Sequence, residues 1–129
     1  ADRVVYTKGS TTVADSAMQA FESGQGVCQD HSHVMLACLR AHGIPARYVS
    51  GYFFNPHVEQ HDSHAWVEVF LPGAGWIGLD PSLGLLADQN YIPLACSFHP
   101  LNTLPIYGTY GGGGSSHLTS EVIIKEVKE

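Results

Sequence analysis

The chain is constrained most by a cysteine that stands between two glycines and an apolar run. Gly24 and Gly26 precede Cys28, and the segment that follows, to about residue 42, is apolar nearly all round in its middle. Residues 43–45 combine a glycine and a proline, a pair typical of a helix end. The pattern therefore predicts a buried helix over residues 28–42 that begins at the cysteine.

A cysteine in the first turn of a helix has a distinctive chemistry. The positive end of the helix dipole and the unpaired backbone N–H groups there favour the thiolate of Cys28, the form that attacks a carbonyl carbon. The alternative is that Cys28 packs as a small hydrophobic side chain, as free cysteines commonly do. The residues downstream decide between these two interpretations.

Strand-like segments follow the helix. Residues 46–54 are rich in aromatic and β-branched side chains and predict a strand. Residues 64–71 and 76–80 predict a β-hairpin around a glycine-rich turn. Other segments predict an extended piece over 3–7, a helix over 14–21 with Thr12 and Asp15 as a capping box, and strands over 104–110 and 118–127. Residues 83–102 are less regular and predict a long connection with short pieces of structure. We therefore expect one α+β domain in which a central buried helix packs on an antiparallel β-sheet.

Cysteine, histidine and an acid occur in an order and context that suit a catalytic triad. Cys28 lies at a helix start, His64 opens a strand, and Asp80 ends the next strand before a proline. In such a set the histidine deprotonates the thiol and later protonates the leaving amine, while the acid fixes its tautomer. Asp80 reaches His64 only if both lie on one face of the hairpin, which requires Trp66 opposite Asp80. That register predicts a turn of roughly three or five residues with a glycine in the left-handed conformation.

Four ordered sequence blocks resemble the microbial transglutaminase-like superfamily: GVCQD at 26–30, GIPARYVSGY at 43–52, SHAWVEV at 63–69 and GWIGLDP at 75–81. The resemblance implies a papain-like transglutaminase core with Cys28 as nucleophile, His64 as base and Asp80 as orienting acid. Members of this type usually carry a β-rich domain ahead of the catalytic part. We therefore expect residues 1–129 to be a catalytic domain from a longer parent, which fits the abrupt start at Ala1.

Further residues are candidates for oxyanion or substrate contacts. The backbone N–H of Cys28 is the natural first oxyanion donor at a helix start, and the side chain of Gln25 is a candidate for the second. His31 either tunes the thiolate and contacts substrate or is a polar residue on the helix surface. Trp66 either walls the cleft or packs in the core. His33 falls about 140° around the helix from Cys28, so we expect it to be a hydrogen-bonded supporting residue.

The leading hypothesis is a cysteine acyl-transfer enzyme that acts on protein or peptide amides without a cofactor. Its thiolate forms a thioester, which water resolves in a protease or amidase and an amine resolves in a transglutaminase. One alternative is a non-catalytic peptide-binding module on the same fold. Another is a metal site built from Cys28, His31 and His33, with His61 or His64. That spacing is not a common zinc pattern, so we expect no metal.

The composition argues against several kinds of partner and location. A net charge of −6, with no cluster of lysine and arginine, argues against nucleic-acid binding. No apolar run approaches the roughly 18–20 residues that span a bilayer. The three cysteines imply no disulfide framework, and the first residues do not form a signal peptide. We therefore expect a reducing, cytoplasmic location.

Overall fold

The structure is a computed structural model of the 129-residue chain that describes residues 3–10, 16–106, 108–109 and 111–128. Its helices are α1 (Ala17–Ser23), α2 (Cys28–Ala41) and a short 3-10 helix, η1 (Pro100–Thr103). Its strands are β1 (Val5–Tyr6), β2 (Gln25–Gly26), β3 (Ala46–Phe53), β4 (Ser63–Leu71), β5 (Gly75–Asp80), β6 (Leu85–Leu86) and β7 (Tyr91–Ser97).

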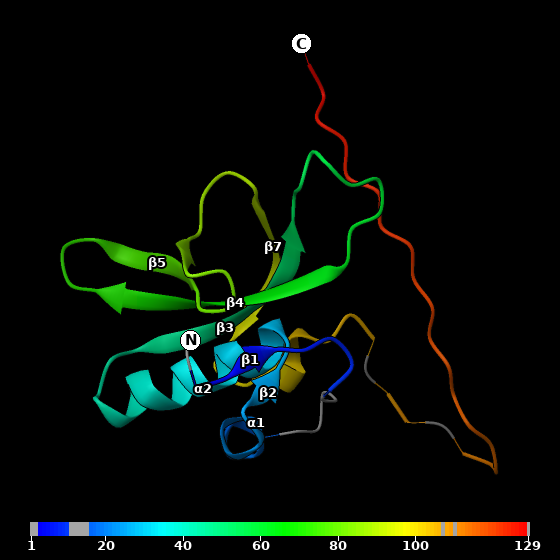
Figure 1. Cartoon of the computed structure of the whole chain (residues 1–129), viewed down its shortest axis with the longest axis horizontal. Helices are drawn as coiled ribbons and strands as arrows, with labels where there is room; N and C mark the ends of the chain where they lie inside the picture. Colours follow the sequence, from blue (N-terminus) through cyan, green and yellow to red (C-terminus); the bar gives the residue numbers. More distant parts are fainter. Residues whose placement is uncertain (1–2, 11–15, 107, 110, 129) are drawn as a thin grey trace.

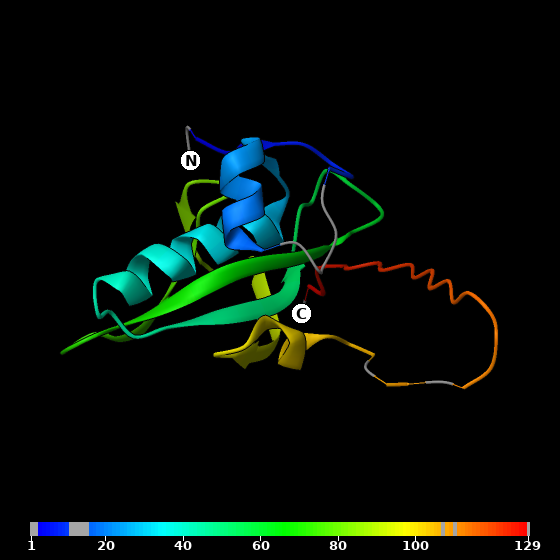
Figure 2. The same ribbon diagram turned by 90° about the horizontal axis from the view of Figure 1, so that it is seen from below.

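The main layer is an antiparallel sheet with the strand order β6-β5-β4-β3-β7. Both α1 and α2 lie on the same side of β3 and β4, and α2 contacts these two strands directly (Figures 1 and 2). The short strands β1 and β2 pair in parallel just ahead of α2. This arrangement confirms the predicted α+β fold, with a helix packed on an antiparallel sheet.

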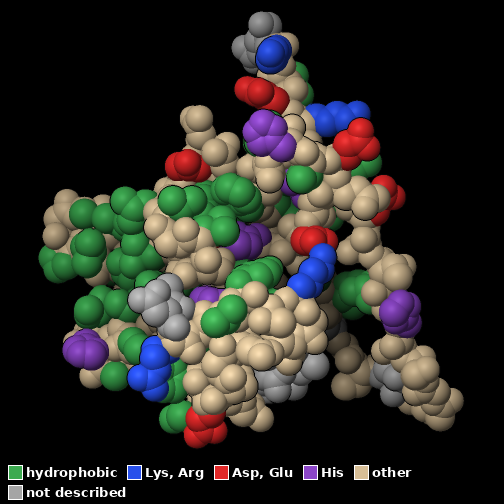
Figure 3. Space-filling view, in the orientation of Figure 1, with side chains coloured by type: hydrophobic (Ala, Val, Ile, Leu, Met, Phe, Trp, Pro, Cys, Tyr) green, Lys and Arg blue, Asp and Glu red, His purple; other side chains and the backbone are tan. Residues whose placement is uncertain are grey.

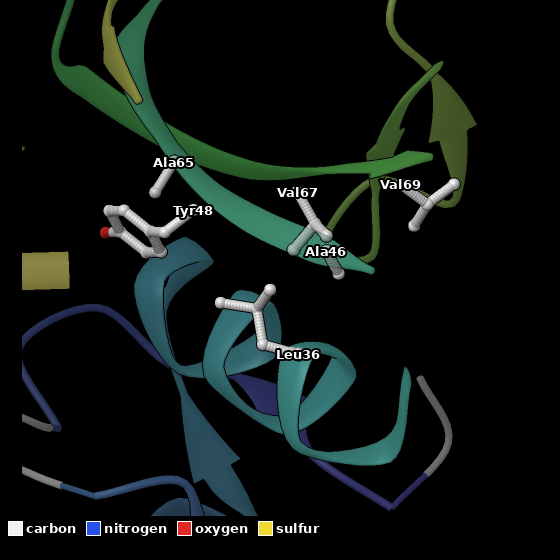
Figure 4. Close-up of a cluster of buried hydrophobic side chains, with 6 residues drawn as sticks. All are labelled: Leu36, Ala46, Tyr48, Ala65, Val67 and Val69. Carbon is white, nitrogen blue, oxygen red and sulfur yellow. The ribbon is translucent and has the colours of Figure 1, made fainter. Parts of the chain in front are cut away.

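The core lies between α2 and the sheet. Leu36 projects from α2 toward side chains that alternate along the two central strands (Figure 4). These partners, all less than a tenth exposed, are Ala46, Tyr48, Ala65, Val67 and Val69. Because alternate residues of a strand point to one face, this set forms a single apolar surface under the helix. The outer side of α2 is exposed at Ala37 and Cys38, so the helix covers one face of the sheet and is not buried all round.

The first helix begins at a side-chain cap. The Oγ of Ser16 accepts from the backbone N–H of Gln19, and the Gln19 side chain accepts from the Ser16 N–H. This reciprocal pair satisfies two backbone donors that the helix leaves without partners. The capping box predicted at Thr12 and Asp15 lies outside the described residues. The helix ends at Gly24, which adopts the left-handed conformation with φ of 69°.

The hairpin of β4 and β5 has the predicted register. Val67 lies opposite Leu79, so the next pair in that register is Trp66 and Asp80. The strands are joined by residues 72–74, a three-residue turn in which Gly73 has φ of 86°. Both the odd turn length and the left-handed glycine are therefore confirmed. Around this hairpin hydrophobic side chains gather at the surface (Figure 3).

The segments after β5 differ from the prediction. Residues 83–102, expected to be a long connection with short pieces of structure, do contain the short element β6 and most of η1. They also contain β7, a seven-residue strand that forms the edge of the sheet beside β3. Gly51 makes this pairing possible, because a Cβ there would lie 2.0 Å from the Ile92 carbonyl oxygen. The predicted strands over 104–110 and 118–127 are wrong: the described residues of both segments form no strand. Most of residues 118–127 are exposed, and a strand-like composition needs a half-buried surface to form a strand.

Candidate active site

Cys28 is the first residue of α2, and the turn before it is held by an acid. The Oδ2 of Asp30 accepts from the backbone N–H of Val27 at 2.8 Å, and Asp30 is fully buried. The hydroxyl of Ser32 donates to the Cys28 carbonyl at 2.8 Å. A carboxylate in the first turn also interacts favourably with the helix dipole. Cys28 is therefore held at the electropositive end of a fixed helix.

Gly26 gives a test of this arrangement. A Cβ at position 26 would lie 2.6 Å from the Cβ of Asp30 and 3.1 Å from its Oδ2. We expect Gly26→Ala to push Asp30 off the Val27 N–H and to lower the free energy of unfolding by about 1–3 kcal/mol, measured by urea denaturation. Gly113→Ala is the matched control, because a Cβ there meets nothing within 4 Å. Equal stability of the two variants would contradict this account.

His64 and Asp80 meet across the hairpin. The Nε2 of His64 lies 2.6 Å from the Oδ2 of Asp80. The side chain of Asp80 is fully buried and that of His64 is 13% exposed. Because Asp80 belongs to the end of β5 and His64 to the start of β4, the contact follows from the hairpin register rather than from any flexible loop.

Hydrogen-bond donors surround the carboxylate of Asp80. Its Oδ2 also accepts from the hydroxyl of Tyr91 at 2.8 Å. Its Oδ1 accepts from the backbone N–H and hydroxyl of Ser82 at 3.0 and 2.7 Å, and from the N–H of Leu83 at 3.2 Å. Burial alone would raise the pKa of Asp80, but the hydrogen bonds from His64, Ser82 and Tyr91 lower it to about 2. The carboxylate is ionised and accepts only, so the proton shared with His64 lies on Nε2.

His64 is placed between Asp80 and Cys28. Burial alone would lower the pKa of His64, but the hydrogen bonds to Asp80 and to Cys28 raise it to about 9. With Nε2 directed at Asp80, the other ring nitrogen, Nδ1, is the one available to the thiol. The structure thus brings together all three residues of the predicted triad in the order thiol, imidazole, carboxylate.

Aromatic rings surround the imidazole. The ring centroids of Phe53, Trp66 and Tyr91 lie 6.0, 6.0 and 6.1 Å from that of His64. Trp66 is only 2% exposed and packs with Val49 and Tyr91 in a second core cluster. Of the two alternatives for Trp66, the structure shows core packing. These rings limit the access of water to the hydrogen bond between His64 and Asp80.

The other predicted contact residues lie elsewhere. His31 is buried, and its Nδ1 and Nε2 lie 2.9 Å from the carbonyl oxygens of Val27 and Val4. It therefore ties the residue before β1 to the N-cap residue of α2. Gln25 is exposed in β2, paired with Val5. Neither His31 nor Gln25 lines the cavity at Cys28.

A cavity of about 420 Å³ opens beside Cys28 and His64. His33 lines it as well, with its ring centroid 5.4 Å from that of Tyr48. This differs from the prediction that His33 lies away from the thiol. The cavity lies between α2 and β3 and is lined by the first turns of α2. It therefore includes a helix residue, His33, that does not share a helix face with Cys28.

The metal-site alternative does not assemble in the part of the chain that the structure describes. There, no group of three or more histidine, cysteine and acidic side chains could hold a metal ion. Both ring nitrogens of His31 face carbonyl oxygens, and His33 packs against Tyr48. The three cysteines, Cys28, Cys38 and Cys96, form no disulfide. Within the described residues, no helix has the length and apolar character needed to cross a membrane.

Sequence reasoning missed the residues that hold Asp80. Ser82 carries a recognisable signal, because a serine two residues after an aspartate commonly closes a side-chain turn with its N–H and hydroxyl. Tyr91 carries none in its local pattern. It reaches Asp80 only because β7 returns along β3, which the sequence did not predict.

Comparisons with known proteins identify the family to which this chain belongs. The sequence profile of the transglutaminase-like superfamily matches residues 1–81. An uncharacterised protein of Mycobacterium leprae is 34% identical over 119 residues, which cover 88% of this chain and 42% of that protein. A protein-glutamine gamma-glutamyltransferase of Pseudomonas aeruginosa is 43% identical over 70 residues, which cover 48% of this chain and 10% of the enzyme. The chain thus spans less than half the length of these relatives.

Solved structures agree. A candidate cysteine protease from Cytophaga hutchinsonii superposes with a TM-score of 0.67 at 33% identity, covering 78% of this chain and 33% of that one. The periplasmic domain of TgpA from Pseudomonas aeruginosa superposes with a TM-score of 0.50 at 38% identity, covering 64% and 33%. Since that neighbour is periplasmic, the cytoplasmic location of the present chain stays a prediction. At the level of the superfamily, the matches support a cysteine-dependent acyltransferase or protease. With a profile match over more than half its length, the chain belongs to the transglutaminase-like superfamily.

Proposed function

We propose that the chain is the catalytic domain of a cysteine acyl-transfer enzyme that acts on amides of proteins or peptides. Cys28 is the nucleophile, His64 the general base and acid, and Asp80 the residue that orients His64. The observation that carries the proposal is the continuous contact from Cys28 through His64 to Asp80, with the two reactive side chains lining one cavity.

The reaction proceeds in two stages. The Cys28 thiolate attacks the amide carbonyl carbon, and the backbone N–H of Cys28, at the start of α2, donates to the oxygen on which negative charge develops. The carbon–nitrogen bond breaks as protonated His64 gives its proton to the leaving nitrogen, which yields a thioester. Water or an amine then gives a proton to His64 and attacks the thioester, which releases the acyl group and regenerates the thiolate.

The relatives point to two kinds of acceptor. The Pseudomonas relative is named as a glutamyltransferase, and such an enzyme transfers the acyl group to an amine. The Cytophaga neighbour is described as a candidate cysteine protease, and a protease transfers the acyl group to water. The proposal therefore includes both acceptors.

Alkylation kinetics distinguish an enzyme from a binding module. Near neutral pH, iodoacetamide should label Cys28 much faster than Cys38 and Cys96, because Cys28 alone of the three interacts with a histidine that can accept the thiol proton. The variant His64→Ala should lose this advantage, as followed by mass spectrometry of the three cysteine peptides. Equal, slow labelling of all three cysteines in the unmodified chain would support the non-catalytic module instead.

The acceptor can be identified by trapping the intermediate. The protein is exposed to a peptide library with and without an amine donor, and mass spectrometry measures the acyl group on Cys28 and the products released. Free acids as the main products would indicate hydrolysis, and amine adducts would indicate transamidation.

A further inference from the structure

The cavity at Cys28 continues past the catalytic residues to a second wall. The middle of β7 contributes Leu94 to this wall, and η1 with the residue after it contributes Pro100, Leu101 and Leu104. Unlike the core, this wall leaves hydrophobic side chains open to solvent: Leu94 is 63% exposed and Leu101 is 44% exposed. Exposed apolar side chains that border a cavity commonly mark a binding surface.

The described residues that line the cavity include His33, His64 and Cys28 but no permanently charged side chain. None of the described residues that line it is lysine, arginine, aspartate or glutamate. A charged substrate side chain would find no opposite charge among these residues and would lose part of its hydration against the leucines, whereas an apolar side chain would gain contact with them. The wall therefore discriminates against acidic and basic side chains.

The wall is held in position by hydrogen bonds. The hydroxyl of Thr103, itself 6% exposed, donates to the Pro100 carbonyl at 2.7 Å. The Nη2 of Arg40 on α2 donates to the carbonyl oxygens of Phe98 and Ala46 at 2.6 and 3.2 Å, so it ties the segment before η1 to the core. A wall fixed in this way keeps its shape before substrate binds, which lowers the entropic cost of binding.

Another part of the cavity lining is polar. It is formed by β3 and the start of β4, with Tyr48, Ser50 and Ser63 in its lining. Figure 4 shows the Tyr48 hydroxyl pointing away from Leu36 and the rest of the core cluster. The cavity thus offers a peptide hydroxyl groups for its backbone and leucines for a side chain.

We propose that this wall, formed by Leu94, Pro100, Leu101 and Leu104, is a specificity subsite that receives one uncharged apolar side chain of the polypeptide whose acyl group is transferred to Cys28. The inference rests on the proposed function, because the subsite shares its cavity with Cys28 and His64. It adds a substrate class: peptides that carry a leucine-like or phenylalanine-like side chain beside the reacting carbonyl.

The test uses probes that need no known substrate. A series of N-acetyl aminoacyl chloromethyl ketones carries the side chain of leucine, phenylalanine, glutamate or lysine, and the Cys28 sulfur displaces chloride from each. Mass spectrometry gives the rate of alkylation at Cys28. We expect the leucine and phenylalanine ketones to react about tenfold or more faster than the glutamate and lysine ketones. In Leu101→Asp, the leucine ketone should slow and the lysine ketone should speed up.

Matched controls separate this proposal from the proposed function. Leu71→Asp changes a leucine of similar exposure, 41%, at the end of β4 outside the cavity and should leave all the ratios unchanged. Iodoacetamide, which is too small to fill the subsite, should label Cys28 equally fast in Leu101→Asp. Equal rates for the leucine and glutamate ketones would contradict the proposal that the wall is a subsite for an apolar side chain. If iodoacetamide labels Cys28 no faster than Cys96, the acyl-transfer proposal is wrong, and the ratio between the ketones still decides the subsite.

Discussion

Replacing Cys28 with alanine is expected to reduce acyl transfer by about 10⁶-fold, the loss seen when a triad enzyme loses its nucleophile. No other described side chain in the cavity can form the thioester while lying within reach of His64. Turnover of a peptide found by trapping at Cys28 is the measurement. The fold should persist, because Cys28 packs only at the margin of the main core cluster.

The remaining cysteines supply matched controls for this prediction. Cys38 and Cys96 are both exposed and form no disulfide. Changing either of them to alanine should leave turnover within about twofold of the original, as surface substitutions away from a site usually do. Turnover by Cys28→Ala above about a thousandth of the original rate would show that the thiol is not the nucleophile, provided its circular dichroism spectrum matches that of the original chain.

The part of the site that could be predicted is the part that local geometry dictates. Side chains alternate between the two faces of a strand, so Asp80 reaches His64 only in a register that places Trp66 opposite Asp80. The hairpin has this register, and its strands are joined by the turn at residues 72–74. The helix start at Cys28 follows in the same way from Gly26 and the apolar run. In each case residues close in sequence determine the outcome.

The features that the sequence did not predict depend on packing between residues that are far apart in the chain. β7 contains Pro93, and proline disfavours a strand prediction because it has no backbone N–H to donate. An edge strand such as β7 tolerates proline, because one side of its backbone needs no hydrogen-bond partner. Residues 118–127 have the composition of a strand but find no half-buried surface. His33 lines the cavity because β3 lies opposite the helix there, a fact that a helical projection of α2 alone does not contain.

Hydrogen-bond donors outside the triad hold the carboxylate of Asp80 in place. Tyr91 and Ser82 come from segments that differ in sequence and structure, and together they saturate the carboxylate with hydrogen bonds. A carboxylate held this way cannot rotate to offer a different oxygen without losing a partner. The orientation of His64 is thus fixed by residues that do not line the cavity, Ser82 and Tyr91.

Asp80→Asn should lower acyl transfer at neutral pH by about 10³–10⁴-fold, although the side chain keeps its size. Its amide nitrogen cannot face the N–H groups of Ser82 and Leu83, which are donors, so it must take the position of Oδ2. There it faces the Nε2 of His64, which must then accept a hydrogen bond. The proton of neutral His64 moves to Nδ1, the nitrogen that has to accept the thiol proton.

The pH profile provides a second, independent measurement on the same variant. In the original chain the proton of His64 is lost as the pH rises through about 9, because Asp80 and Cys28 favour the charged ring, so activity should fall on the alkaline side near that value. In Asp80→Asn the anion is gone while burial still disfavours the charged ring, so the alkaline fall should move to lower pH. Asp88→Asn, an exposed carboxylate outside the cavity, is the control and should leave both rate and profile unchanged. An unshifted alkaline limb in Asp80→Asn, with a rate within threefold of the original, would remove Asp80 from the mechanism.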